Sequence, residues 1–214
     1  MHSREFAELA GAFTGDGWIS KNRKGGTTLV ISGNPKDEKE YYKRIAKLWK
    51  KEFGKEMKPR EFHYWKTHGI MCCNPEIIDK FERAGLKVSR KAAVCKVPKE
   101  IIKNKESHLP FIRGLFDTDG SIFFGKSHNK NASRWQKEKH HIPTVQFASV
   151  SLSLINTLKR MLEGQKFNFP LYKYTPKKEK AEHDILSAHD RKKECNKIFQ
   201  NIKTGKQPTL KQIQ

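Results

Sequence analysis

Long hydrophobic runs are missing from this chain of 214 residues. No apolar stretch approaches the length of a membrane-spanning helix, and residues 1–5 contain no hydrophobic signal core. These absences argue against a membrane partner and against secretion. We therefore expect an intracellular protein, cytoplasmic or nucleoid-associated, with no targeting signal.

Cysteine pairs at metal-binding spacing are also missing. The chain has four cysteines, none in a Cys-x-x-Cys pair. This pattern excludes the common zinc motifs and a disulfide framework as sources of stability. We expect buried thiols at the four positions Cys72, Cys73, Cys95 and Cys195.

Acidic residues are few compared with basic ones. The chain has 44 Lys and Arg against 23 Asp and Glu, a net charge of +21. A thermophile-like surface would be rich in both signs, whereas here only one sign is in excess. A positive surplus of this size in a chain with enough apolar residues to fold indicates a polyanionic partner.

A short pattern is present twice, at residues 9–17 (LAGAFTGDG) and 112–120 (IRGLFDTDG). Each copy predicts a helix with small or compact residues at every fourth position. Such residues form a flat stripe, along which two helix backbones can approach closely. The stripes consist of Ala7, Gly11 and Gly15 in the first copy and Pro110, Gly114 and Thr118 in the second.

Both predicted helices end in an acid, Asp16 and Asp119. Pro110 suits the first turn of its helix, and Gly17 and Gly120 suit left-handed C-terminal caps. A carboxylate at a helix C-terminus is disfavoured by up to about 1 kcal/mol. Packing the helices side by side would concentrate this charge, for which a divalent metal is a natural counter-ion. A single Asp-Gly pair often only closes a turn, but two in matching helices favour the metal site.

The repeat resembles the signature of the LAGLIDADG homing endonucleases. The segment PFIRGLFDTDGSI is similar to the second motif of their single-chain members. The resemblance implies that the motif helices form a pseudo-twofold interface and that Asp16 and Asp119 are the catalytic, metal-binding acids. Gly15 and Thr118, which precede these acids, are the accompanying metal-site positions.

The first copy departs from the family pattern at Thr14, where Asp117 is the counterpart in the second copy. That position is not the metal-binding one of the family. Family members often place polar or basic residues around the metals. The ends of the second strands offer Gly33, Asn34 and Ser149 at the corresponding places.

The resemblance further implies Mg²⁺ as the cofactor and double-stranded DNA as the target. One acid would serve each strand, and a double-strand break would leave short 3′ overhangs at a long site. Because the two halves differ, we expect an asymmetric target and a monomeric enzyme. The chain has no Cys or Ser at its start and no His-Asn end, which favours a free-standing, intron-encoded protein. Two alternatives stay open: an RNA-binding intron maturase with intron RNA as partner, and an inactive DNA-binding regulator.

The order of predicted elements is αββαββα, and it repeats. We expect an α+β fold of two pseudo-symmetric halves packed through the two LAGLIDADG helices, with antiparallel sheets forming a DNA-binding saddle. The boundaries are residues 1–85 for the N-terminal half, 86–106 for a linker, 107–202 for the C-terminal half and 203–214 for a tail.

Several individual elements follow from local patterns. Asn74 and Pro75 predict a helix start, and Gly54 a helix end. The remaining expectations are strands at 61–66, 70–73, 121–125, 144–150, 167–174 and 184–187, and a last helix at 195–199.

Hairpins can present side chains to base edges in the major groove. A basic insertion at residues 126–142 could follow the DNA backbone, although a solvated loop without contacts is the alternative. The DNA-contact candidates are Lys21, Arg23, Lys126, Lys130, Arg134, Gln146 and Lys173.

Overall fold

The structure is a computed structural model of the chain. The backbone is described for residues 2–22, 25–36, 38–86, 94–126, 139–174 and 183–189. Side chains at 123–126, 139–144, 173–174 and 183–189 lie outside the description. The predicted helix at 195–199 and the tail also fall outside it.

The first half follows the predicted αββαββα order. Its elements are α1 (Arg4–Asp16), β1 (Gly17–Lys21), β2 (Thr27–Gly33), α2 (Lys39–Phe53), β3 (Arg60–Phe62), β4 (Thr67–Cys72) and α3 (Pro75–Arg83). The predicted start of α3 is confirmed, because the Asn74 side chain accepts a hydrogen bond from the Ile77 N–H at 3.2 Å. Gly54 ends α2 in the left-handed conformation with φ 66°, also as predicted.

After a short helix, the described part of the second half repeats the first six elements of this order, and the predicted last helix lies outside the description. Its elements are α5 (Lys99–Lys103), α6 (Lys105–Asp119), β5 (Gly120–Lys126), β6 (Lys139–Ser149), α7 (Leu152–Gly164), β7 (Leu171–Tyr174) and β8 (His183–His189).

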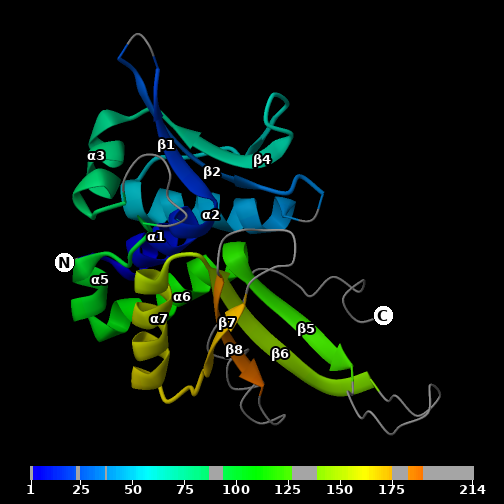
Figure 1. Cartoon of the computed structure of the whole chain (residues 1–214). Helices are drawn as coiled ribbons and strands as arrows, with labels where there is room; N and C mark the ends of the chain where they lie inside the picture. Colours follow the sequence, from blue (N-terminus) through cyan, green and yellow to red (C-terminus); the bar gives the residue numbers. More distant parts are fainter. Residues whose placement is uncertain are drawn as a thin grey trace, which may run out of the picture.

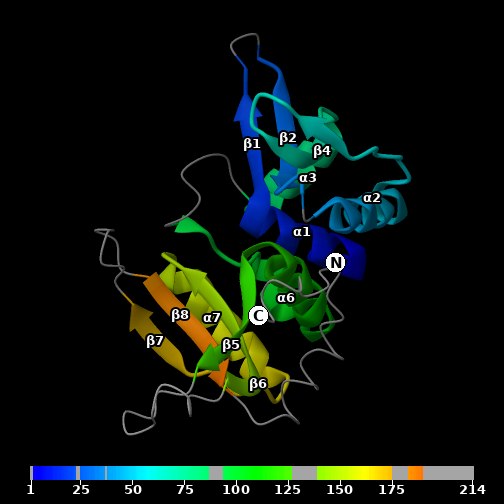
Figure 2. The same ribbon diagram turned by 90° about the vertical axis from the view of Figure 1, so that its right-hand side faces the viewer.

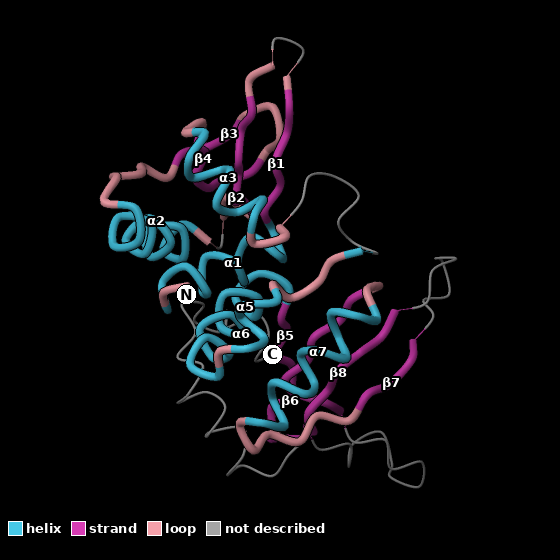
Figure 3. Tube along the Cα trace, turned by 90° about the vertical axis from the view of Figure 1, so that its left-hand side faces the viewer, coloured by secondary structure: helices cyan, strands magenta, loops and turns pink. Residues whose placement is uncertain are grey.

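Each half contains one four-stranded antiparallel sheet. The strand orders are β1-β2-β4-β3 and β5-β6-β8-β7, which are the same topology used twice. Helices α1 and α6 lie between the two sheets (Figures 1 and 2). Helix α7 lies across the second sheet (Figure 3). The predicted α+β fold with two similar halves is therefore confirmed.

Helices α1 and α6 pack backbone to backbone along their small residues. A Cβ atom added at Gly11 would lie 2.8 Å from the Leu115 nitrogen and closer still to the Phe111 carbonyl oxygen. At Gly114 it would lie 2.7 Å from the Ala12 nitrogen and closer still to the Glu8 carbonyl oxygen. The stripes thus form the helix interface, because only glycine lets the backbones approach this far.

Three predictions about the motif helices are wrong. Pro110 lies inside α6, since that helix begins at Lys105, upstream of the expected start. Gly17 and Gly120 have extended backbone conformations, with φ −95° and −77°. After each motif helix the backbone continues directly into a strand, so neither helix ends in a left-handed cap. The glycines are required by packing, as a Cβ at Gly17 would lie 2.6 Å from the Phe13 ring.

Two strand predictions are also wrong in extent. Residues 63–66 form a turn, closed by a hydrogen bond from the Trp65 N–H to the Phe62 carbonyl oxygen at 3.0 Å. Residues 167–170 precede β7 without joining it. In both places aromatic residues have high strand propensity. Residues 63–66, however, reverse the chain between Phe62 and Thr67, which pair across β3 and β4, and the pairing of β7 with β8 begins only at Leu171.

Buried side chains form a core that spans both halves and the motif helices. Of the described cysteines only Cys72 is buried, whereas Cys73 is exposed and Cys95 is intermediate, so the expectation of buried thiols fails for these two. Cys195 lies outside the described residues. Among the residues described, no helix has the length and apolarity needed to cross a membrane.

Candidate active site at the ends of the paired helices

The two predicted acids end the two packed helices, α1 at Asp16 and α6 at Asp119. A Cβ placed on Gly15 would lie 2.6 Å from the Thr118 Cβ and 3.2 Å from the Asp119 carboxyl carbon. The Asp119 carboxyl group therefore packs against the residue that precedes Asp16. Asp119 is exposed and Asp16 half-buried, so both can be reached from solvent.

A third carboxylate, that of Glu38, lies on the Asp16 side. Gly33 ends β2 there, and its missing side chain leaves room for two carboxylates. The Cβ position at residue 33 has Asp16 Oδ2 at 3.0 Å and the Glu38 Oε2 closer still. The Asn34 N–H donates to the same Glu38 oxygen at 3.0 Å, which holds the side chain in place.

The Tyr42 hydroxyl completes this side and donates to Asp16 Oδ2 at 3.4 Å. Burial raises the pKa of Tyr42 well above its usual value, and the negative charges of Asp16 and Glu38 raise it further. Tyr42 therefore stays a neutral hydrogen-bond donor at any ordinary pH. It fixes one Asp16 oxygen and leaves the group negative.

The donor set fits a hard divalent cation. Carboxylate oxygens converge where two helices end, and the last carbonyl groups of a helix have no partner within it. Oxygen donors of this kind suit Mg²⁺, Mn²⁺ or Ca²⁺. Within the described part of the chain no group of three or more His, Cys, Asp or Glu side chains has metal-binding geometry. An ion here would thus complete its coordination with water and substrate phosphate, which is the usual arrangement for Mg²⁺.

Asp117 has a different role from Asp119. Its side chain is fully buried, and Arg44 of α2 donates to it at 2.7 Å. Arg44 also pairs with the buried Glu8 of α1, and Arg113 of α6 pairs with Glu8 at 3.1 Å. This ion-pair network joins three helices from both halves. It sets the position of the α6 end, two residues before Asp119.

The structure places two of the predicted DNA contacts and leaves the rest undescribed. Gln146 is half-buried and alternates with the core residues Val145 and Phe147, so it faces away from the core. Lys21 is exposed but shares its side of β1 with the buried Ile19. Lys126 and Lys173 lie in strands with undescribed side chains, and Arg23, Lys130 and Arg134 fall outside the described residues.

Sequence patterns did not point to Glu38, Tyr42 or Arg44 as residues of the site. Glu38 and Tyr42 are four residues apart, a spacing that can bring two side chains to one face of a helix, but the spacing alone does not show what they face. Tyr42 is buried. Neither residue has a counterpart in the repeated motif, so the repeat could not reveal them.

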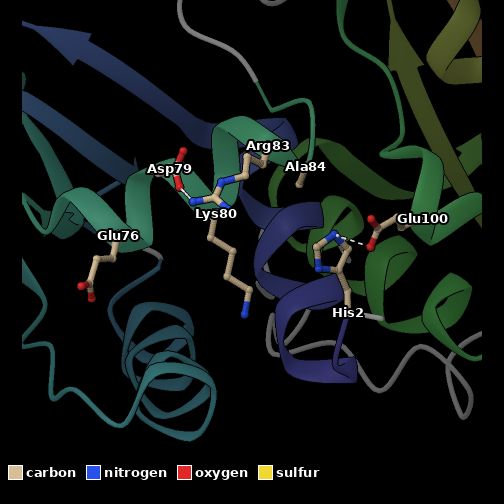
Figure 4. Close-up of a pocket in the computed structure, with 7 residues that line it drawn as sticks. All are labelled: His2, Glu76, Asp79, Lys80, Arg83, Ala84 and Glu100. Carbon is tan, nitrogen blue, oxygen red and sulfur yellow. Dashed lines mark hydrogen bonds and ion pairs between the residues drawn. The ribbon is translucent and has the colours of Figure 1, made fainter.

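A second concavity of about 350 Å³ lies at the other end of α1 (Figure 4). Two pairs of its lining side chains contact each other, and the lining Lys80 pairs with Glu52 outside the concavity. His2 pairs with Glu100 at 3.2 Å, and Arg83 pairs with Asp79. Burial lowers the pKa of His2. This concavity lies a whole helix length from Asp16 and is not part of the candidate site.

Comparison with known proteins agrees with the fold. Residues 106–198 match the LAGLIDADG-like domain family. The fold is similar to that of the homing endonuclease I-DmoI in complex with DNA and Mn, with TM-score 0.61, 13% identity, and coverage of 93% of this chain and 96% of that one. It is also similar to the I-LtrWI LAGLIDADG homing endonuclease bound to target DNA, with TM-score 0.59, 14% identity, and coverage of 95% and 85%.

A curated relative matches over a shorter segment. The replication factor C small subunit of Methanocaldococcus jannaschii is 34% identical over 122 residues, which is 56% of this chain. The matched segment is only 6% of that relative's length. Further I-DmoI structures with this fold were solved with DNA and Ca, or with target DNA in the presence of Mg.

Proposed function

We propose that this chain, whose residues 106–198 match the LAGLIDADG-like domain family and whose fold is similar to that of I-DmoI, is a sequence-specific DNA endonuclease. It makes metal-dependent double-strand breaks with short 3′ overhangs at a long, asymmetric site, acts as a monomer and is encoded within an intron. The observation that supports this most is the packing of the Asp119 carboxyl group against Gly15, the residue before Asp16, where the two packed helices end.

Asp16 and Asp119 would hold the ion, with the backbone at Gly15 and Thr118 beside it. Bound Mg²⁺ supplies an activated water and neutralises charge on the phosphate in this type of hydrolysis. Tyr42 orients one Asp16 oxygen, and Glu38 adds negative charge beside Asp16.

The surplus of positive charge supports the proposal of a DNA partner, because phosphate contacts dominate affinity for nucleic acids. An intron maturase would need the same charge but would not require two solvent-accessible carboxylates at the helix ends. The presence of Asp16 and Asp119 at matching helix ends therefore favours cleavage over RNA binding alone.

The decisive experiment combines cleavage and binding. The protein is incubated with Mg²⁺ and a plasmid library carrying randomised or candidate insertion sites, and cut products are sequenced. Asp16→Asn and Asp119→Asn should each abolish cutting while changing the affinity for the recovered target by less than about threefold, since each removes only one charge at the metal site.

Asp79→Asn is the matched control, because it removes one acid far from the C-terminal ends of α1 and α6. It should cut like the wild type. Failure of the wild type to cut any site, together with tight binding to an intron RNA, would replace the proposal with the maturase. Full cutting by both Asn variants at the helix ends would show that these acids are not the catalytic ones.

A further inference from the structure

A cluster of aromatic side chains projects from the turn between β3 and β4. The turn comprises residues 63–66, and Phe62, the last residue of β3, lies at its base. Tyr64 at its tip is 93% exposed, and Trp65 beside it is 40% exposed. Single exposed apolar residues are common, but two large exposed rings next to each other form an apolar patch, which is typical of a binding surface.

The base of the turn is held firmly. Phe62 is buried, and its ring centroid lies 5.4 Å from that of Trp65. The N–H groups of Trp65 and Lys66 donate to the carbonyl oxygens of Phe62 and His63, at 3.0 and 3.3 Å. These contacts hold the backbone of the turn at Tyr64 in place. Fixing the Tyr64 side chain against a ligand would therefore cost little conformational entropy.

The turn lies at the same end of the first sheet as Asp16. The Trp65 ring packs edge-on against Trp18, two residues after Asp16, with centroids 5.1 Å apart. Next to the turn, His68 pairs with Gly33 across the β2–β4 ladder, and Gly33 borders the Asp16 carboxylate. A DNA strand bound at Asp16 therefore passes close to this turn.

The charge around the turn suits a polyanion. Lys66 and Arg60 are exposed on either side of the aromatic residues, with the Arg60 guanidinium 5.5 Å from the Phe62 ring centroid. Glu61, the acid next to the aromatic residues in the chain, is paired with Lys39 at 3.2 Å. Aromatic rings between basic side chains form a surface typical of contact with nucleic-acid bases.

We propose that Tyr64, supported by Trp65, is a wedge that packs against bases of the DNA on the Asp16 side and unstacks one base step. This inference rests on the proposed function. Wedges of this kind kink the duplex and bring more of it against the protein. The corresponding connection in the second half, residues 175–182, contains no aromatic residue in its sequence. The wedge therefore acts on one side of the cleavage site only.

The test uses 2-aminopurine, which becomes brighter when it is unstacked. The probe is the duplex recovered by the cleavage selection, with 2-aminopurine placed at each position in turn and bound to Asp119→Asn so that it stays intact. Fluorescence should rise at one step on a single side of the scissile positions. Adding Tyr64→Ala should remove the rise and lower the affinity about tenfold, whereas Tyr64→Phe should keep both.

Salt separates stacking from charge. Tyr64→Ala should leave the slope of log affinity against log salt unchanged, whereas Lys66→Ala should reduce its magnitude by about 1. Ile102→Ala is the matched control, since it removes a 40% exposed apolar side chain on α5, far from Asp16. It should change neither the fluorescence nor the affinity.

The wedge and the proposed function fail in different ways. If the parent protein binds and cuts its target but Tyr64→Ala retains the fluorescence rise and the affinity, the wedge is wrong and the nuclease stands. If Tyr64→Ala weakens binding to an intron RNA and leaves DNA binding intact, the wedge on DNA is overturned too. Absence of DNA binding by the wild type would instead refute the proposed function.

Discussion

The close packing of α1 against α6 gives a prediction with a calculable size. In Gly114→Ala the new methyl group would lie 2.7 Å from the Ala12 nitrogen and closer still to the Glu8 carbonyl oxygen. Both are backbone atoms of a helix and cannot rotate away. The two helices must therefore separate by about 1 Å to restore ordinary contact distances, which is overpacking in a well-packed core.

Overpacking of this kind costs about 1–3 kcal/mol, and the better helix propensity of alanine offsets about 0.5–1 kcal/mol. We expect Gly114→Ala to lower the free energy of unfolding by about 1–2 kcal/mol. Cleavage should suffer more than stability, because the helices carry Asp16 and Asp119. A displacement of about 1 Å in a catalytic group can cost about a hundredfold in rate.

The assay is urea unfolding followed by circular dichroism, with cleavage rates measured at a temperature where every variant is folded. Gly164→Ala is the matched control, because an added Cβ there meets nothing within 4 Å. It should be neutral or slightly stabilising. If Gly114→Ala is as stable and active as Gly164→Ala, the backbones of α1 and α6 do not approach closely enough to exclude a methyl group at residue 114.

Two further predictions concern buried charge. Arg44→Met leaves the buried carboxylates of Glu8 and Asp117 without this cation. It should lower the free energy of unfolding by about 3 kcal/mol in urea titrations. A loss below about 0.5 kcal/mol would show that the network contributes no more than ordinary surface contacts do. Burial lowers the pKa of His68 below 6.5, and the Lys39 charge lowers it further. Protonation therefore favours the unfolded state, so this contribution to stability is complete above pH 6.5 and is lost as the pH falls below it. Unfolding curves between pH 7 and 5 should show this loss, and His68→Asn should flatten it, whereas the exposed His63→Asn should not.

The repeated motif made much of the fold predictable. Small residues at every fourth position of both helices predict the stripe where the backbones meet, and this holds at Gly11 and Gly114. Alternating and helical apolar patterns gave the αββαββα order. Local propensity failed at residues 63–66, where aromatic residues suit a strand but the chain must reverse direction between the paired ends of β3 and β4.

The candidate site, too, was only partly predictable from the sequence. Asp16 and Asp119 could be found from the sequence because the same acid ends both copies of the motif. Glu38 and Tyr42 could not be assigned to it, because their approach to Asp16 depends on how β2 ends at Gly33 and how α2 folds back. No sequence pattern within α2 indicates which side chains of other elements its residues will contact.

The sequence by itself therefore determined the two helices, their small-residue stripes, the terminal acids and the positive charge, because each is a property of local spacing or of composition. Tertiary structure alone decided that Glu38 enters the space beside Gly33, that Arg44 joins Glu8 to Asp117, and that Trp65 rests on Trp18. These contacts join residues far apart in the chain. Their geometry is set by the packing of whole helices and sheets, which no single segment encodes.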